Sequence, residues 1–78
     1  MYNSSNPSSI RSKQQIIEAL LRLMEKYPYD EISVKQIVLE TDLVRKTFYR
    51  NFSSKDDVLN AYISQKIYEY TRALLEKP

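Results

Sequence analysis

Residues 47–55 read Thr47-Phe48-Tyr49-Arg50-Asn51-Phe52-Ser53-Ser54-Lys55, and this stretch decides how the rest of the chain is interpreted. Phe48 and Phe52 are one helical turn apart, so they lie on the same face of a helix. Cationic side chains surround this pair, at Arg45, Lys46, Arg50 and Lys55. No acidic residue occurs between Leu43 and Lys55. We therefore expect a short helix that is anchored by its aromatic face and presents cations on the other side, a shape suited to a polyanion.

The composition limits the chemistry that is available to the chain. It has 78 residues, a formal net charge of +2, and no Cys, His or Gly. A chain of this length buries only about 60% of its unfolded surface, so we expect one domain with a small core. Without Cys and His it lacks disulfides, thiolate ligands and the commonest general base. Asp56 and Asp57 are adjacent in sequence, so on a helix they diverge and cannot act as a general acid/base pair. We expect no cofactor, no metal site and no enzyme activity.

The N-terminal part predicts a flexible arm over residues 1–9 and a first helix over residues 10–26. Apolar side chains recur there at helical spacing, at Ile16, Ile17, Leu20, Leu21, Leu23 and Met24. Pro28 ends this helix because the residue before a proline is disfavoured in the helical region. Tyr27 and Tyr29 are expected to cover the core rather than to bind a ligand. No apolar run could span a bilayer or act as a signal peptide, which favours a soluble, cytoplasmic protein.

A second helix is expected over residues 34–41. Ser33 and Gln36 have the spacing of a capping box, and Ile32 can pack on Ile37 as a hydrophobic staple. A turn must then separate this helix from the next, and such turns usually need a residue with positive φ. Since the chain has no Gly, we expect Asp42 to adopt that conformation.

The third helix is expected over residues 44–52, and a fourth helix over residues 54–78. The start of the fourth helix should join the core through Val58, Leu59, Tyr62 and Ile63. Its apolar stripe continues past the reach of three short helices, at Ile67, Tyr70 and Leu74. This end is either exposed or packed on something that the chain does not contain. The predicted fold class is all-α: a three-helix helix-turn-helix (homeodomain-like) bundle over residues 10–53, extended by a fourth helix.

Several of these motifs occur together in one known family. They are Ser33-Val34-Lys35-Gln36-Ile37, then Leu43, then Thr47-Phe48-Tyr49-Arg50-Asn51-Phe52, then Lys55-Asp56-Asp57-Val58-Leu59. This series resembles the N-terminal DNA-binding domain of TetR/AcrR-type transcriptional repressors. The resemblance implies that the third helix lies in the major groove of a palindromic DNA operator. By the same resemblance, phosphate contacts would come from Ser33, Lys35, Thr47, Tyr49, Asn51 and Lys55. Contacts near base edges would come from Val44, Arg45, Lys46 and Arg50.

The resemblance also implies partners that this chain would need. Such repressors form homodimers and bind a small-molecule effector through a larger helical C-terminal domain, and no such domain precedes Pro78. We therefore expect the chain to be a fragment or a short relative. The alternative function is a protein-interaction module whose working surface is the stripe Ile67, Tyr70 and Leu74.

Overall fold

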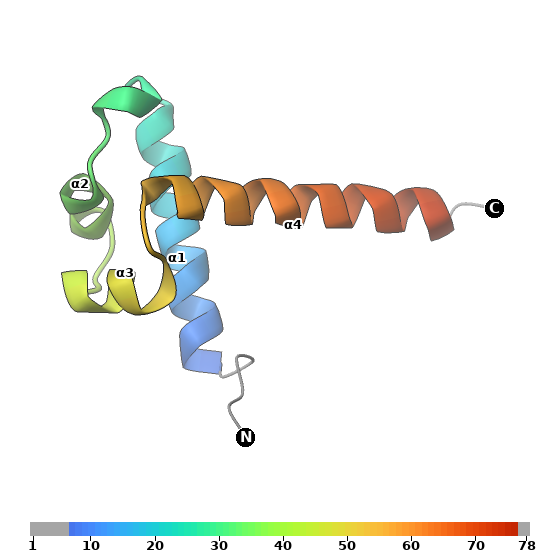
Figure 1. Ribbon diagram of the computed structural model, residues 1–78, viewed down its shortest axis with the longest axis horizontal. Helices are drawn as coiled ribbons and strands as arrows, with labels where there is room; N and C mark the ends of the chain where they lie inside the picture. The colour runs from blue at the N-terminus through green and yellow to red at the C-terminus, as the bar shows by residue number, and fades with distance from the viewer. Residues whose placement is uncertain (1–6, 77–78) are drawn as a thin grey trace.

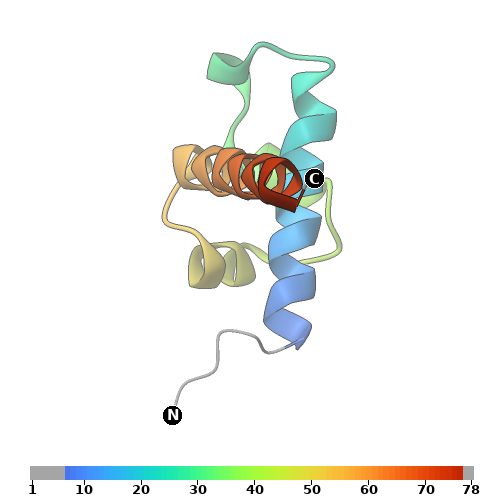
Figure 2. The same ribbon diagram turned by 90° about the vertical axis from the view of Figure 1, so that its right-hand side faces the viewer.

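Helices make up most of the computed structural model, which describes residues 7–76 (Figure 1). The elements are α1 (Pro7–Met24), the 3₁₀ turn η1 (Tyr29–Glu31), α2 (Val34–Leu39), α3 (Arg45–Asn51) and α4 (Lys55–Glu76). No strand occurs within this range, and the predicted all-α fold is confirmed. Helix α1 packs against α2, α3 and α4. The greater part of α4 extends away from the other helices (Figure 1), and Figure 2 looks nearly along this helix.

The first helix is longer at its start and shorter at its end than the sequence indicates. It begins at Pro7 rather than at residue 10, so residues 7–9 of the expected arm are helical, whereas residues 1–6 lie outside the described range. Proline suits the first helical position because its missing N–H would have no partner there. The helix ends at Met24, and the N–H groups of Lys26 and Tyr27 both bond to the Leu23 carbonyl, at 3.0 and 2.9 Å.

The core is small and apolar. Among the described residues it contains Ile16, Ile17, Ala19, Leu20, Leu23, Ile32, Ile37, Phe48, Phe52 and Val58. Leu59 and Tyr62 pack against this cluster, as the sequence indicates, but Ile63 does not. The prediction of a core Ile63 is wrong, since its side chain is 44% exposed. Ile63 directly follows Tyr62, the last residue of α4 that packs against the core.

The start of α2 follows the sequence prediction closely. The Ser33 Oγ accepts a hydrogen bond from the Gln36 N–H at 3.1 Å, and the Gln36 Oε1 accepts one from the Ser33 N–H at 2.8 Å. This capping box satisfies N–H groups that the first turn of a helix leaves unpaired. Ile32 and Ile37 both belong to the core, so the helix enters the bundle at a fixed position. It ends at Leu39, two residues earlier than expected.

The turn between α2 and α3 is built differently from the prediction. No described residue has a positive φ, so the conformation expected of Asp42 is wrong. The Thr41 side chain organises the turn instead: its Oγ1 donates to the Val38 carbonyl at 2.7 Å and accepts from the Leu43 N–H at 3.0 Å. Because one hydroxyl both donates and accepts, the backbone changes direction without a left-handed residue. Leu43 is half-buried against the core.

The start of α4 is capped by one side chain just before the helix, Ser54, and by one in its first turn, Asp57. The Ser54 Oγ accepts from the Asp57 N–H at 3.1 Å, and the Asp57 Oδ2 accepts from the Ser53 N–H at 2.9 Å. Carboxylates are favourable in this first turn because the N-terminal end of a helix is partly positive. These bonds hold the short connection between α3 and α4.

Candidate DNA-binding surface

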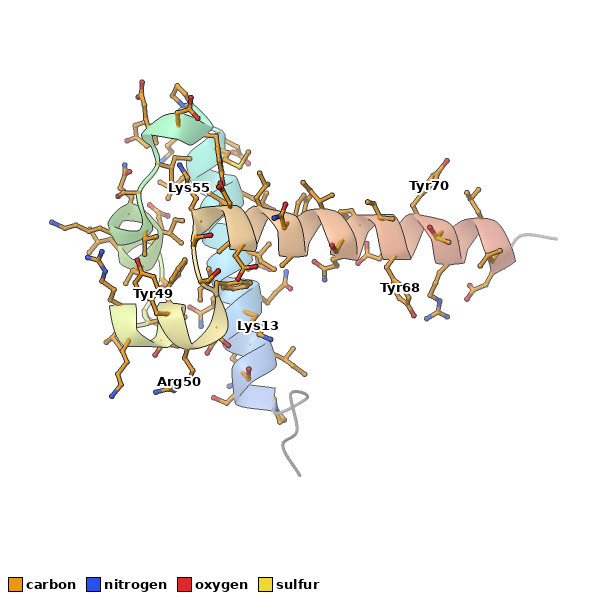
Figure 3. The ribbon with its side chains drawn as sticks, viewed as in Figure 1. Lys13, Tyr49, Arg50, Lys55, Tyr68 and Tyr70 are labelled. Atoms are coloured by element: carbon orange, nitrogen blue, oxygen red, sulfur yellow. The ribbon has the colours of Figure 1, made fainter. Side chains whose placement is uncertain are left out.

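Helix α3 is oriented by the two phenylalanines on its inner face. Phe48 is 0% exposed and Phe52 is 6% exposed, and their ring centroids are 6.0 Å apart. Burial of these rings forces the opposite face of this short helix outward. That face and the N-cap carry Val44, 63% exposed, Tyr49, 49% exposed, and the exposed side chains of Arg45, Lys46 and Arg50. Figure 3 shows Tyr49 and Arg50 leaving α3 in different directions.

The cations of this surface have no acidic partner within the described range. The ion pairs found between residues 7 and 76 lie elsewhere, at Arg22–Glu40, Lys66–Glu69 and Arg72–Glu76. Among these cations, Arg45 has an aromatic neighbour: its Cζ lies 6.0 Å from the centre of the Tyr49 ring. Cations without local counter-charges produce a positive potential that attracts a polyanion. The exposed Lys35, in the first turn of α2, adds to this potential.

Hydroxyl groups border the basic surface. Ser33 is exposed at the N-cap of α2, and its Oγ accepts a hydrogen bond from Gln36, which leaves its O–H free to donate. Thr47 is half-buried on the flank of α3. The N-cap of α2 and the outer face of α3 thus offer hydrogen-bond donors from two helices. Such donors are the groups with which proteins hold DNA phosphates.

Asn51 is placed differently from the sequence expectation. Its Nδ2 donates to the Thr47 carbonyl at 2.9 Å, and its Oδ1 accepts from the Ser9 Oγ at 3.2 Å. Both ends of this half-buried amide are therefore bonded inside the protein. The side chain connects the last turn of α3 to the first turn of α1, and it is not directed at an outside ligand.

Lys55 also has internal partners. Its Nζ donates to the Tyr29 carbonyl at 2.7 Å and to the Ile32 carbonyl at 2.9 Å, and it lies 4.1 Å from the centre of the Tyr29 ring. This ammonium group therefore faces the connection between α1 and α2, and one of its three N–H donors remains for an outside ligand. Figure 3 shows Lys55 at the start of α4, beside that connection.

Sequence reasoning missed a contact that holds α2 against α1. The Arg22 Nη2 donates to the Glu40 carbonyl at 3.1 Å, and its Nε lies 3.4 Å from the Glu40 Oε1. The arginine thereby caps the C-terminal end of α2, where cations are favourable. The two residues are far apart along the chain, and no local pattern marks them as partners.

The phenol of Tyr29, between α1 and α2, has a raised pKa. Of the two tyrosines expected to cover the core, Tyr29 packs against it, whereas Tyr27 is 44% exposed. The Tyr29 hydroxyl donates to the Asp56 carboxylate. Burial, and then the hydrogen bond to Asp56, raise the pKa of Tyr29 to about 12 from its ordinary value of 10.0.

A pH titration can detect this tyrosine. Between pH 10.0 and about 12 the folded state holds a proton that the unfolded state has lost, so stability should fall as the pH rises through this range. In absorbance titrations of tyrosinate, Tyr29→Phe should remove a late phase near pH 12. Asp56→Asn should move that phase to lower pH, because the neutral amide no longer opposes the phenolate. A late phase that persists in Tyr29→Phe would assign it to another tyrosine.

Neither a metal centre nor a membrane span is present in the part of the chain that the structure describes. Residues 7–76 contain no group of three acidic, His or Cys side chains that could hold a metal ion. None of the helices there combines the length and apolar character needed to cross a bilayer.

The chain was compared with known families, curated proteins and solved structures. The model of the family described as bacterial regulatory proteins, tetR family, matches residues 16–62. The matched range runs from the buried part of α1 through α2 and α3 to the first two turns of α4. No curated protein and no solved structure matched the chain. Because the match covers more than half of the sequence and every helix of the bundle, the chain belongs to the tetR family of bacterial regulatory proteins and carries its helix-turn-helix DNA-binding domain.

Proposed function

We propose that α3 lies in the major groove of a DNA operator and that the chain acts there as a transcriptional repressor by occupying the site. The observation that carries this proposal is the two-sided character of α3. Its aromatic face is buried, and its cations are exposed without acidic partners within residues 7–76. A helix of this width fits the major groove of B-form DNA.

Base readout is assigned to Arg45 and Arg50, with Val44 and Lys46 close to base edges. An arginine can donate two parallel hydrogen bonds to the O6 and N7 of guanine, which discriminates against other bases by roughly 1–3 kcal/mol. Val44 can contact the methyl group of thymine. All four side chains are exposed on the outer side of α3 or at its N-cap.

Phosphate contacts are assigned to Ser33, Lys35, Thr47 and Tyr49. Ser33 and Lys35 lie at the start of α2, and Thr47 and Tyr49 lie in α3. Their hydroxyl and ammonium groups are donors of the kind that contact phosphate oxygens. Asn51 is left out of this set because both ends of its amide are bonded within the protein. Lys55 keeps one of its three N–H donors for a phosphate, since only two are bonded to carbonyls.

We further propose that the operator is palindromic and that the regulator binds it as a homodimer under the control of a small-molecule effector. The effector and dimer contacts would come from a helical domain that packs on the outer part of α4. The exposed stripe there supports this assignment: Ile67 is 60%, Tyr70 is 68% and Leu74 is 54% exposed. A two-fold dimer would place its recognition helices roughly 34–36 Å apart, one turn of DNA.

Selection of duplexes from a random pool, followed by titration at several salt concentrations, tests the proposal. We expect enrichment of one sequence, or of two inverted half-sites, and a steep loss of affinity with salt. Lys35→Ala should weaken binding to all duplexes alike and reduce the salt slope by about one, as expected for one lost phosphate contact. A pool that stays random, with no salt-sensitive binding, would contradict the proposal. A tight homodimer without affinity for DNA would instead favour a protein-interaction module.

A further inference from the structure

Thr41 lies in the turn between α2 and α3, and its side chain makes hydrogen bonds on both sides of the turn. Its Oγ1 donates to the Val38 carbonyl at 2.7 Å and accepts from the Leu43 N–H at 3.0 Å. The Thr41 N–H also donates to the Val38 carbonyl, at 2.9 Å. One half-buried residue thereby ties the last turn of α2 to the segment that leads into α3.

Other parts of the fold hold the segments that flank this turn. On one side, the Arg22 Nη2 of α1 donates to the Glu40 carbonyl at 3.1 Å. On the other side, Leu43 packs against the core. No described residue adopts a positive φ, so the backbone does not pass through a left-handed residue between these two anchors. The Thr41 hydroxyl supplies the side-chain hydrogen bonds that shape the backbone there.

The start of α3 depends on the same turn. Its N-cap is Val44, whose apolar side chain makes no capping hydrogen bond. The residues assigned to base edges begin at this point, with Val44, Arg45 and Lys46. A displacement of the backbone at Leu43 would therefore move these side chains together, because they belong to one helical turn.

We propose that Thr41 is a positioning residue for DNA binding: its hydroxyl sets where α3 begins relative to α2, and with it the register of the base-edge side chains. This inference rests on the proposed function of that surface. Thr41 acts through Leu43 and α3, and its hydroxyl does not bind phosphate. A threonine hydroxyl has a single O–H, and the Val38 carbonyl accepts it, so no side-chain donor remains for a phosphate oxygen.

Loss of the hydroxyl would loosen the turn rather than remove a contact to DNA. A partly buried backbone N–H is costly to leave unpaired, so the Leu43 N–H would have to find another partner by a change of backbone conformation. The folded protein would then populate more than one arrangement of α2 and α3. Only the fraction with α3 in its original position would fit the groove, and the apparent affinity falls by that fraction.

The experiment compares the unmodified chain with Thr41→Val, Thr41→Ala, Thr41→Ser and the control Thr71→Val. Valine has the shape of threonine without the hydroxyl, alanine is a second hydroxyl-free variant that fits the turn without a γ-methyl group, and serine restores the hydroxyl. Thr71 is exposed on the outer part of α4, far along the chain from the turn. None of these substitutions changes the net charge.

Each protein is titrated with the duplex selected from the random pool and with an unrelated duplex, at several salt concentrations. The binding constants are referred to the folded fraction measured by circular dichroism, so that a loss of stability alone does not count as a loss of affinity.

We expect Thr41→Val and Thr41→Ala to bind the selected duplex roughly three- to tenfold more weakly, the factor that corresponds to about one net hydrogen bond. Thr41→Ser and Thr71→Val should bind like the unmodified chain. The slope of log K against log salt should stay unchanged, because no phosphate contact is lost. Binding to the unrelated duplex should change less, since it depends chiefly on phosphate contacts.

Normal affinity of both hydroxyl-free variants for the selected duplex would overturn the proposal, even if these variants are less stable, because the hydroxyl would then serve the fold alone. An equal loss in Thr41→Ser would assign the effect to the methyl group and would also overturn it. A shallower salt slope for Thr41→Val would make Thr41 a phosphate contact, with the same consequence. If the unmodified chain and Thr71→Val bind no duplex, the proposed function itself is wrong.

Discussion

Replacing Phe48 by Ala is expected to leave most of the chain unfolded at room temperature. Phe48 is 0% exposed and is the largest of the fully buried side chains. Truncation of a buried phenylalanine costs about 3–5 kcal/mol, because apolar contacts are lost and a cavity remains. A single core in a chain of this length rarely supplies more than about 3–5 kcal/mol of net stability. The expected loss of stability is as large as the free energy of unfolding of the whole chain, so the folded state should no longer dominate.

Urea or thermal unfolding followed by circular dichroism measures this effect. Tyr49→Ala is the matched control, since it removes a neighbouring aromatic ring that is 49% exposed. Its ring centroid lies 5.1 Å from that of Phe48 in an edge-on contact, and such pairs are worth about 0.5–1.5 kcal/mol. The control should therefore be mildly destabilised but folded. If Phe48→Ala unfolds at the same denaturant concentration as the unmodified chain, the aromatic anchor does not hold α3.

Replacing Arg50 by Ala is expected to have the largest effect on the recognition of a selected operator. Arg50 is exposed on α3, with no acidic partner among the described residues. Loss of a bidentate contact to guanine should reduce affinity for the selected duplex by roughly 5- to 150-fold, the equivalent of 1–3 kcal/mol. Affinity for an unrelated duplex should fall much less, so the preference for one base at one position should relax.

Arg72→Ala is the matched control for this measurement. Arg72 lies on the outer part of α4, where it pairs with Glu76 at 2.7 Å and its Cζ lies 5.9 Å from the centre of the Tyr68 ring. The two variants lose the same charge, so any difference between them reports the position of the arginine. Repeating the selection with Arg50→Ala shows which base lost its preference. An equal loss on all duplexes would reassign Arg50 to the phosphate backbone.

Acidic residues precede and follow α3 along the chain. Asp42 is exposed in the turn after α2, and Asp56 and Asp57 lie in the first turn of α4. Asp56 and Asp57 accept hydrogen bonds inside the protein, from the Tyr29 hydroxyl and from the Ser53 N–H. Their charges are thereby held at the start of α4.

Short-range features of this protein could be predicted from the sequence. The spacing of Phe48 and Phe52 indicated which face of α3 is buried, and Ser33 and Gln36 indicated where α2 begins. These features depend on residues within one or two helical turns of each other, so helical geometry alone relates them. The family of the chain could be recognised for the same reason, because its motifs are local.

Tertiary packing decided the features that join distant segments. Lys55 is paired with Ile32 across 23 positions, Arg22 with Glu40 across 18, and Ser9 with Asn51 across 42. A basic residue near an expected DNA surface is equally compatible with phosphate and with an internal carbonyl until the neighbouring backbone is placed. The exposure of Ile63 likewise depends on where α4 leaves the bundle, since an apolar side chain is buried only if another element reaches it. Local sequence patterns therefore determined the helices and their inner faces, and packing of the helices determined which polar side chains remain free to meet DNA.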